Sequence, residues 1–161
     1  MPSFDVVSRT DLMEVDNGIN GMLREIKQRF DLAGTKCDIS RTDNTLTMTA
    51  DDSMKMGQMD DLLRKYLARR NVDLRALEFK PRQTAPGGSI RQDIAIRQGI
   101  DEDLGRKISK AVRGTGIKVQ LTIHGTELRV TAKKRDDLQA TIAFLKESDI
   151  EQPLQFVNFR E

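Results

Sequence analysis

The sequence contains one pattern of predicted elements twice, about 80 residues apart. Each half predicts a strand, an amphipathic helix, two strands joined by a short turn, a second helix and a final strand. Both halves also carry Asp-Asp-Leu in the region of the second helix, at residues 60–62 and 136–138. The repeat therefore predicts an α+β protein made of two ferredoxin-like β-α-β-β-α-β units, each a four-stranded antiparallel sheet with two helices on one face.

Hydrophobic periodicity gives the expected bounds of these elements. The apolar face of the first helix is expected to continue to Phe30, and Gly18 and Gly21 within it indicate close packing on a sheet. The segment 81–89 contains Pro-Gly-Gly-Ser and is interpreted as a loop or linker. In the first half we expect strands at 3–7, 36–40, 45–50 and 74–79, with helices at 11–29 and 53–67. In the second half we expect strands at 90–97, 117–123, 128–132 and 154–160, with helices at 101–113 and 136–145.

Composition argues against several classes of function. His124 and Cys37 are the only histidine and cysteine, so a zinc site of several His and Cys ligands cannot form. Nucleophile-elbow, P-loop and Rossmann glycine motifs are absent. The longest apolar run, residues 142–145, is far too short to span a membrane, and the N-terminus has no basic head or apolar stretch of a secretory signal. The sequence therefore predicts a cytoplasmic protein that is not an enzyme, has no cofactor or metal and does not bind a membrane.

Positive charge is concentrated in residues 106–135, which hold nine basic side chains and one acid, Glu127, in a protein of net charge +2. Such a cluster predicts either a surface that binds phosphates or simply a well-solvated surface. Strand alternation places part of it on the open face of the second sheet, with Lys118, Gln120, Thr122, His124, Arg129 and Thr131 pointing outward. These strands contain no aromatic residue, so stacking of bases on the sheet is disfavoured.

The candidate site therefore rests on phosphate capture by basic residues. We predict phosphate contacts from Lys118, Arg129, Lys133, Lys134 and Arg135, and weaker contacts to a base or sugar from Gln120 and His124. The last three basic residues lie where a strand enters a helix, and a helix N-terminus attracts anions. Two alternatives to these contacts stay open here. Lys133, Lys134 and Arg135 would simply be exposed to solvent if Asp136 and Asp137 only cap the helix. His124 would be an ordinary surface or turn residue without a ligand.

Several phrases resemble the YajQ family of bacterial proteins over the whole chain. They are Met1-Pro2-Ser3-Phe4-Asp5-Val6-Val7-Ser8, Arg97-Gln98-Gly99-Ile100, Leu128 to Thr131 with Lys134 to Gln139, and Gln152 to Phe156 with Asn158-Phe159-Arg160. The resemblance implies that the first strands of the two units are exchanged, which periodicity does not show. Residues 9–98 would then form the first unit, with strand 90–97 from the second repeat. Residues 1–8 and 99–161 would form the second unit, and 81–89 would be a linker.

The same resemblance implies a function. The family is described as nucleotide-binding, and cyclic di-GMP, nucleoside triphosphates and RNA are associated with its members, some of which act as cyclic di-GMP effectors through a regulatory protein partner. A different class of function also stays open, namely a protein-interaction module that recruits a partner through exposed sheet edges without any nucleotide.

Overall fold

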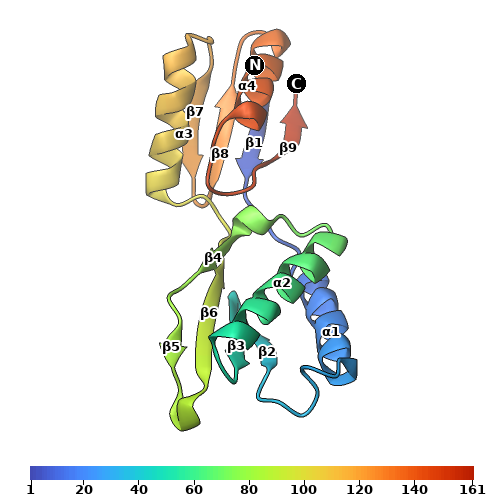
Figure 1. Cartoon of the computed structure of the whole chain (residues 1–161). Coiled ribbons are helices and arrows are strands. Elements are labelled where there is room, and N and C mark those ends of the chain that lie inside the picture. The colour runs from blue at the N-terminus through green and yellow to red at the C-terminus, as the bar shows by residue number, and fades with distance from the viewer. The chain divides into compact units, whose positions relative to one another are not determined.

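The computed structural model describes residues 1–161 and contains two antiparallel sheets with two α-helices each (Figure 1). The chain divides into two compact units, a first unit of Thr10–Arg97 and a second unit of Met1–Arg9 with Gln98–Glu161. No helix is both long enough and apolar enough to cross a lipid bilayer. The α+β class and the antiparallel sheets predicted from the repeat are confirmed.

The first unit contains a sheet in the order β2-β3-β6-β4, with a short additional strand β5 paired to β6. The expected turn between β2 and β3 is present but is shorter than the four residues 41–44 that turn chemistry indicated: Arg41 and Thr42 continue β2, and only Asp43-Asn44 form the turn. The elements of this unit are α1 (Leu12–Gln28), β2 (Asp38–Thr42), β3 (Thr45–Ala50), α2 (Ser53–Arg69), the 3₁₀ turn η1 (Leu74–Ala76), β4 (Leu77–Phe79), β5 (Gln83–Thr84), the 3₁₀ turn η2 (Pro86–Gly88) and β6 (Ile90–Ile96). Segment 81–89 thus contributes a strand pair and lies inside the first unit.

The second unit contains a sheet in the order β7-β8-β1-β9. Its elements are β1 (Ser3–Val7), α3 (Glu102–Thr115), β7 (Gln120–His124), β8 (Glu127–Thr131), α4 (Arg135–Glu147) and β9 (Gln155–Arg160). The first strand of the chain therefore pairs with strands that follow it by more than 100 residues. The strand that opens the second repeat, β6, pairs instead with β3 and β4 of the first unit. The exchange of first strands is confirmed.

Each unit has its own hydrophobic core between the helices and one face of the sheet. In the second unit Phe4 and Val6 of β1 are fully buried among residues of α3, α4 and β8. All five residues of β1 are buried, although Ser3 and Asp5 point to the open face of the sheet, away from the helices. β1 is thus a central strand that is buried on both faces. It pairs with β8, and the candidate site lies at the end of β8 and of its partner β7.

Gly18 and Gly21 lie against α2 rather than against the sheet, which corrects the sequence-based expectation. A Cβ on Gly18 would lie 2.9 Å from a methyl carbon of Leu67, and one on Gly21 would lie 2.9 Å from two ring carbons of Tyr66. These distances are shorter than carbon atoms tolerate. The two glycines therefore allow α1 and α2 to approach each other closely.

Phe30 does not continue the apolar face of α1, contrary to the sequence-based expectation. The helix ends at Gln28, and the backbone of Arg29 is already extended. Phe30 is consequently turned into solvent and is fully exposed. The neighbouring Leu32 is fully buried and belongs to the core of the first unit instead.

Candidate functional site

A pocket with a volume of about 710 Å³ lies where the pairing of β7 with β8 ends. The last paired residues are Gln120 and Thr131, so the segments before β7 and after β8 separate from each other. The sequence pattern predicted a strand from residue 117, whereas the backbone N–H of Val119 donates to the carbonyl of Ile117 and makes a tight turn. This turn keeps Lys118 out of the strand ladder and opens the pocket.

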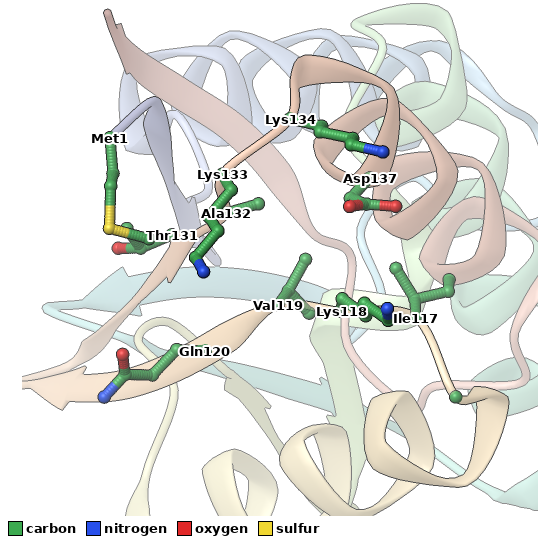
Figure 2. Close-up of a pocket in the computed structure, with 11 residues that line it drawn as sticks. Met1, Ile117, Lys118, Val119, Gln120, Thr131, Ala132, Lys133, Lys134 and Asp137 are labelled. Atoms are coloured by element: carbon green, nitrogen blue, oxygen red, sulfur yellow. The ribbon is translucent and has the colours of Figure 1, made fainter.

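Three lysines dominate the chemistry of this pocket. Lys118 comes from the segment before β7, and Lys133 and Lys134 come from the segment that joins β8 to α4. All three are exposed, and their side chains make no ion pair or hydrogen bond within the chain. Figure 2 shows Lys133 between the two separated segments, with Lys118 and Lys134 on other sides of the space. The pocket therefore offers three ammonium groups that are free to bind an anion.

The start of α4 adds uncapped backbone N–H groups beside these lysines. The N-cap residue is Lys134, and no side chain caps the helix. In α1, α2 and α3, by contrast, an aspartate at the N-cap accepts a hydrogen bond from the first turn. The expectation that Asp136 or Asp137 caps α4 is wrong, because both lie inside the first turn. The N–H of Asp137 donates to the carbonyl of Lys134 at 3.2 Å, so the N–H groups of Arg135 and Asp136 are the ones that remain available to a negatively charged group.

One acidic side chain limits the positive charge. Asp137 lines the pocket together with the three lysines, and Figure 2 draws it near Lys134. The charged side chains of the lining therefore sum to +2 when all four are ionised. The carboxylate of Asp137 also interacts favourably with the positive end of the helix dipole. It therefore weakens the attraction of the helix N-terminus for a bound anion. The lysines accordingly provide most of the anion binding.

The remaining lining of the pocket is apolar or weakly polar. The side chains of Met1, Ile117, Val119 and Ala132 supply apolar surface, and Gln120 and Thr131 supply hydrogen-bonding groups at the end of the β7–β8 pairing. No aromatic residue lines the pocket. A flat base would therefore pack against aliphatic side chains rather than stack on a ring, and polar selection would come from an amide and a hydroxyl group.

The structure brings four of the seven predicted site residues together and separates the other three. Lys118, Gln120, Lys133 and Lys134 line the pocket. His124 lies at the opposite end of β7, beside the turn to β8, where it shares a hydrogen bond of 3.0 Å with Thr122. Four residues along a strand correspond to about 13 Å, so Gln120 and His124 of one chain are too far apart to hold the same base or sugar.

The other two residues, Arg129 and Arg135, form ion pairs within the chain. Arg129 donates from Nε to the carboxylate of Asp5 at 3.2 Å, and Arg135 pairs with Glu161 at the end of the chain. Neither lines the pocket. Arg135 instead lines a smaller depression of about 190 Å³ beside β9.

Asp5 is the centre of a charged network on the open face of the second sheet. Its carboxylate accepts hydrogen bonds from Arg160, Asn158 and Arg129, and it is almost completely buried. The hydrogen bonds from Arg160, together with those from Asn158 and Arg129, hold the pKa of Asp5 far below its ordinary value, although burial alone would raise it. Asp5 thus remains ionised at neutral pH and links β1 to both of its neighbours.

The cluster of positive charge seen in the sequence is therefore divided in space. Four of its nine basic residues form ion pairs with acids that lie outside residues 106–135. These pairs are Arg106 with Asp103, Lys107 with Glu151, Arg129 with Asp5, and Arg135 with Glu161. Lys110 and Arg113 lie on α3, away from the pocket. Only the three lysines of the pocket converge on one space.

Sequence reasoning missed Met1, Ile117, Val119 and Ala132 as lining residues, whereas Thr131, which alternation places on the open face beside the basic residues, does line the pocket. Alternation assigned Ile117, Val119 and Ala132 to the core, because it assumed a continuous strand. The neighbouring Gly114-Thr115-Gly116 was the available signal, since Gly116 ends α3 in a left-handed conformation at φ 77° and redirects the chain before β7. The structure contains no group of three or more His, Cys, Asp or Glu side chains placed to hold a metal ion.

Comparison with known proteins gives a consistent result over the full length of the chain. Residues 2–160 match the family model described as nucleotide-binding protein YajQ-like. The chain is 52% identical to a protein named nucleotide-binding protein from Parvibaculum lavamentivorans over 161 residues, all of both chains. Relatives of the same name from Rhodospirillum centenum and Paramagnetospirillum magneticum are 50% and 48% identical, again over all of both chains.

Proposed function

Because the chain belongs to the YajQ-like family of nucleotide-binding proteins, we propose that it binds a nucleotide and that the lysine pocket of the second unit holds the phosphates. The single observation that carries this proposal is the convergence of Lys118, Lys133 and Lys134 on one space beside an uncapped helix N-terminus. Lysine ammonium groups and free backbone N–H groups are common partners of phosphate oxygens in proteins.

Absence of competing partners strengthens this assignment. The lysines of the pocket have no acidic partner at ion-pair distance, whereas Arg129 and Arg135 are each held by a carboxylate. A phosphate that binds the lysines therefore does not have to break an existing ion pair. The pocket carries more cationic than anionic side chains, so a phosphate bound there would meet a net positive surface.

A compact ligand fits the pocket better than a long nucleic acid. A volume of about 710 Å³ lies within the range of roughly 300–1,000 Å³ typical of small-molecule sites. The basic residues outside the pocket are largely paired with acids, so they do not continue it into a long positive track. We therefore favour a cyclic dinucleotide such as cyclic di-GMP, or a nucleoside triphosphate, over RNA.

The proposed role is binding without catalysis. Asp137 is the only carboxylate of the pocket, and His124, the only histidine, lies at the far end of β7. The pocket therefore lacks the pair of a nucleophile and an adjacent base on which hydrolases rely. A protein that binds a nucleotide without converting it can act as an effector, and we propose such a regulatory role with a protein partner.

A binding screen tests this function. The purified full-length chain is titrated calorimetrically with cyclic di-GMP, ATP, GTP and a short single-stranded RNA, each at several salt concentrations. We expect saturable binding of at least one compact nucleotide with a shallow dependence of log affinity on log salt. A steep dependence with preference for RNA would favour a phosphate track, and absence of binding to every probe would contradict the proposal. Chromatography of the nucleotide after incubation would reveal any conversion, which would contradict the non-enzymatic role.

A further inference from the structure

The edge strand β7 lacks the features that usually protect the edges of sheets. It is five residues long, pairs with β8 without any register shift and carries no Lys, Arg, Asp, Glu or Pro. The opposite edge, β9, has a register shift against β1, a left-handed Asn158 and the charged Arg160. Charges, bulges and prolines on edge strands prevent pairing with another chain. The edge of β7 is thus open to an additional strand.

The geometry of the hairpin shows which backbone groups are free. The turn Gly125-Thr126 joins the strands with two residues, and His124 pairs with Glu127 beside it. In such a hairpin the pair next to the turn exchanges both hydrogen bonds, and hydrogen-bonded pairs then alternate along the ladder. Gln120, Thr122 and His124 therefore bond to β8, whereas the N–H and C=O groups of Leu121 and Ile123 point away from the sheet.

Side chains at this edge are also incompletely covered. Ile123 is 50% exposed although it belongs to the apolar face of the sheet. A Cβ on Gly105 would lie 3.6 Å from Ile123 and 3.5 Å from Leu128, so α3 lies above both β7 and β8. The helix covers the inner half of Ile123 and leaves the half at the edge of the sheet open.

We propose that a second copy of this chain pairs with β7 in antiparallel orientation, about a two-fold axis that passes beside Thr122. This register places Leu121 of each copy opposite Ile123 of the other, and these are the two residues whose backbone groups are free. Four main-chain hydrogen bonds would form, and the half-exposed apolar side chains would cover each other. The two sheets would join into one continuous sheet of eight strands.

We choose a second copy as the partner, rather than an unrelated strand, because β7 is complementary to itself. In the proposed register Thr122 lies opposite Thr122, and Gln120 lies opposite His124 of the other copy. Every cross-strand pair is therefore apolar with apolar or polar with polar, and none is a pair of like charges. Neighbouring strands are about 4.8 Å apart, so a helix over β7 and β8 would lie about 10 Å from its copy, which is a normal packing distance.

This arrangement has a consequence for the candidate site that rests on the proposed function. Gln120 lines the lysine pocket, and the dimer would bring His124 of the second copy beside it. The two residues predicted to contact a base or sugar are separated by the length of β7 in one copy. They would meet only across the dimer axis.

Cysteine cross-linking tests the register. Thr122 is exposed, and two copies of it would form a non-hydrogen-bonded pair with Cα atoms about 4.5 Å apart, within disulfide range. We expect Thr122→Cys to form a disulfide-linked dimer under mild oxidation. The matched variant His124→Cys should not link to itself, because its two copies would be about 13 Å apart. The natural Cys37 is buried and serves as the background control in the unsubstituted chain.

Sedimentation analysis of the full-length chain without nucleotide tests the association itself. We expect a concentration-dependent dimer that Thr122→Lys converts entirely to monomer, because two lysines would face each other at the axis. Thermal melting of the variant checks that the monomer is folded. A chain that stays monomeric at all concentrations, a dimer that survives Thr122→Lys, or efficient linking of His124→Cys would each overturn the proposal. None of these readouts depends on nucleotide binding, so failure of the proposed function would leave them unchanged.

Discussion

Asp5 of β1 accepts a hydrogen bond from Nε of Arg129 on β8 at 3.2 Å, and the two residues lie directly opposite each other in the strand ladder. They are 124 residues apart in the sequence. Arg160 of β9 approaches the same carboxylate from the other side, at 2.9 Å. One buried acid thus fastens the strand from the start of the chain to both neighbours in the sheet that carries the lysine pocket.

Replacement of Asp5 by Asn should strongly destabilise the second unit. The variant removes the negative charge while two guanidinium groups remain beside it, and loss of one partner of a buried ion pair is costly. Because both arginines are partly exposed and regain water, we expect a loss of about 2–3 kcal/mol in the free energy of unfolding. Urea unfolding measures this loss. Glu78→Gln, which breaks an exposed pair with Lys80, is the control and should cost less than about 1 kcal/mol.

Acid should remove the contribution of Asp5. Hydrogen bonds from Arg160, Asn158 and Arg129 lower its pKa in the folded state, so folding favours the ionised carboxylate. The stabilisation is therefore complete above the unfolded pKa of about 3.9 and is lost as the pH falls below it toward the folded value. The difference in unfolding free energy between the unsubstituted chain and Asp5→Asn should be constant from about pH 5 to 7 and should shrink below about pH 4. A difference that grows on acidification would contradict this account.

Arg129→Ala should affect stability rather than ligand affinity. The side chain is held by Asp5 and does not line the pocket. We expect the unfolding free energy to fall by about 1–2 kcal/mol, because Arg160 still neutralises the acid. Affinity for a bound nucleotide should change by less than about twofold, as for other residues that do not touch the site. Calorimetric titration beside urea unfolding separates the two effects, and a large loss of affinity in a stable variant would show that Arg129 contacts the ligand.

Close packing of α1 on α2 should make Gly21 intolerant of larger side chains. Its Cβ position lies 2.9 Å from the ring of Tyr66, so Gly21→Leu should cost about 1–3 kcal/mol through overpacking. Gly57 provides the matched control within α2, because a Cβ there would meet no atom within 4 Å. Gly57→Ala should stabilise the protein by about 0.5–1 kcal/mol. Equal effects of the two substitutions on the melting temperature would contradict the proposed helix contact.

The sequence predicted the order and type of the main elements because periods of two and 3.6 residues report which face of each element is buried. It predicted the two hairpins, β2 with β3 and β7 with β8, but not which unit receives each first strand, since two similar units can exchange equivalent strands without any change in alternation. The exchange of β1 and β6 followed only from the family resemblance. Local details differed where single residues redirect the chain, as at Phe30, where the helix has already ended.

The candidate site was predicted in part for a related reason. A sequence shows which residues are basic, but it does not show which of them form ion pairs with distant acids. Asp5 and Glu161 approach Arg129 and Arg135 only in the folded chain. The tight turn at Ile117–Val119 that opens the pocket was hidden by a regular alternation of apolar residues. Charge patterning therefore found the lysines, and the structure selected which of them converge.

The most direct test of the central claim is nucleotide binding by a variant in which Lys118, Lys133 and Lys134 are all replaced by alanine. Its matched control replaces Lys107, Lys110 and Lys146, which removes the same charge from helix surfaces outside the pocket. With the nucleotide that binds the unsubstituted chain best, we predict an affinity about 100-fold weaker for the pocket variant, or about 2.7 kcal/mol. The control should lose no more than about threefold, as expected for long-range electrostatics in salt. Equal losses in the two variants, or unchanged affinity in the pocket variant, would contradict the assignment of the phosphate site.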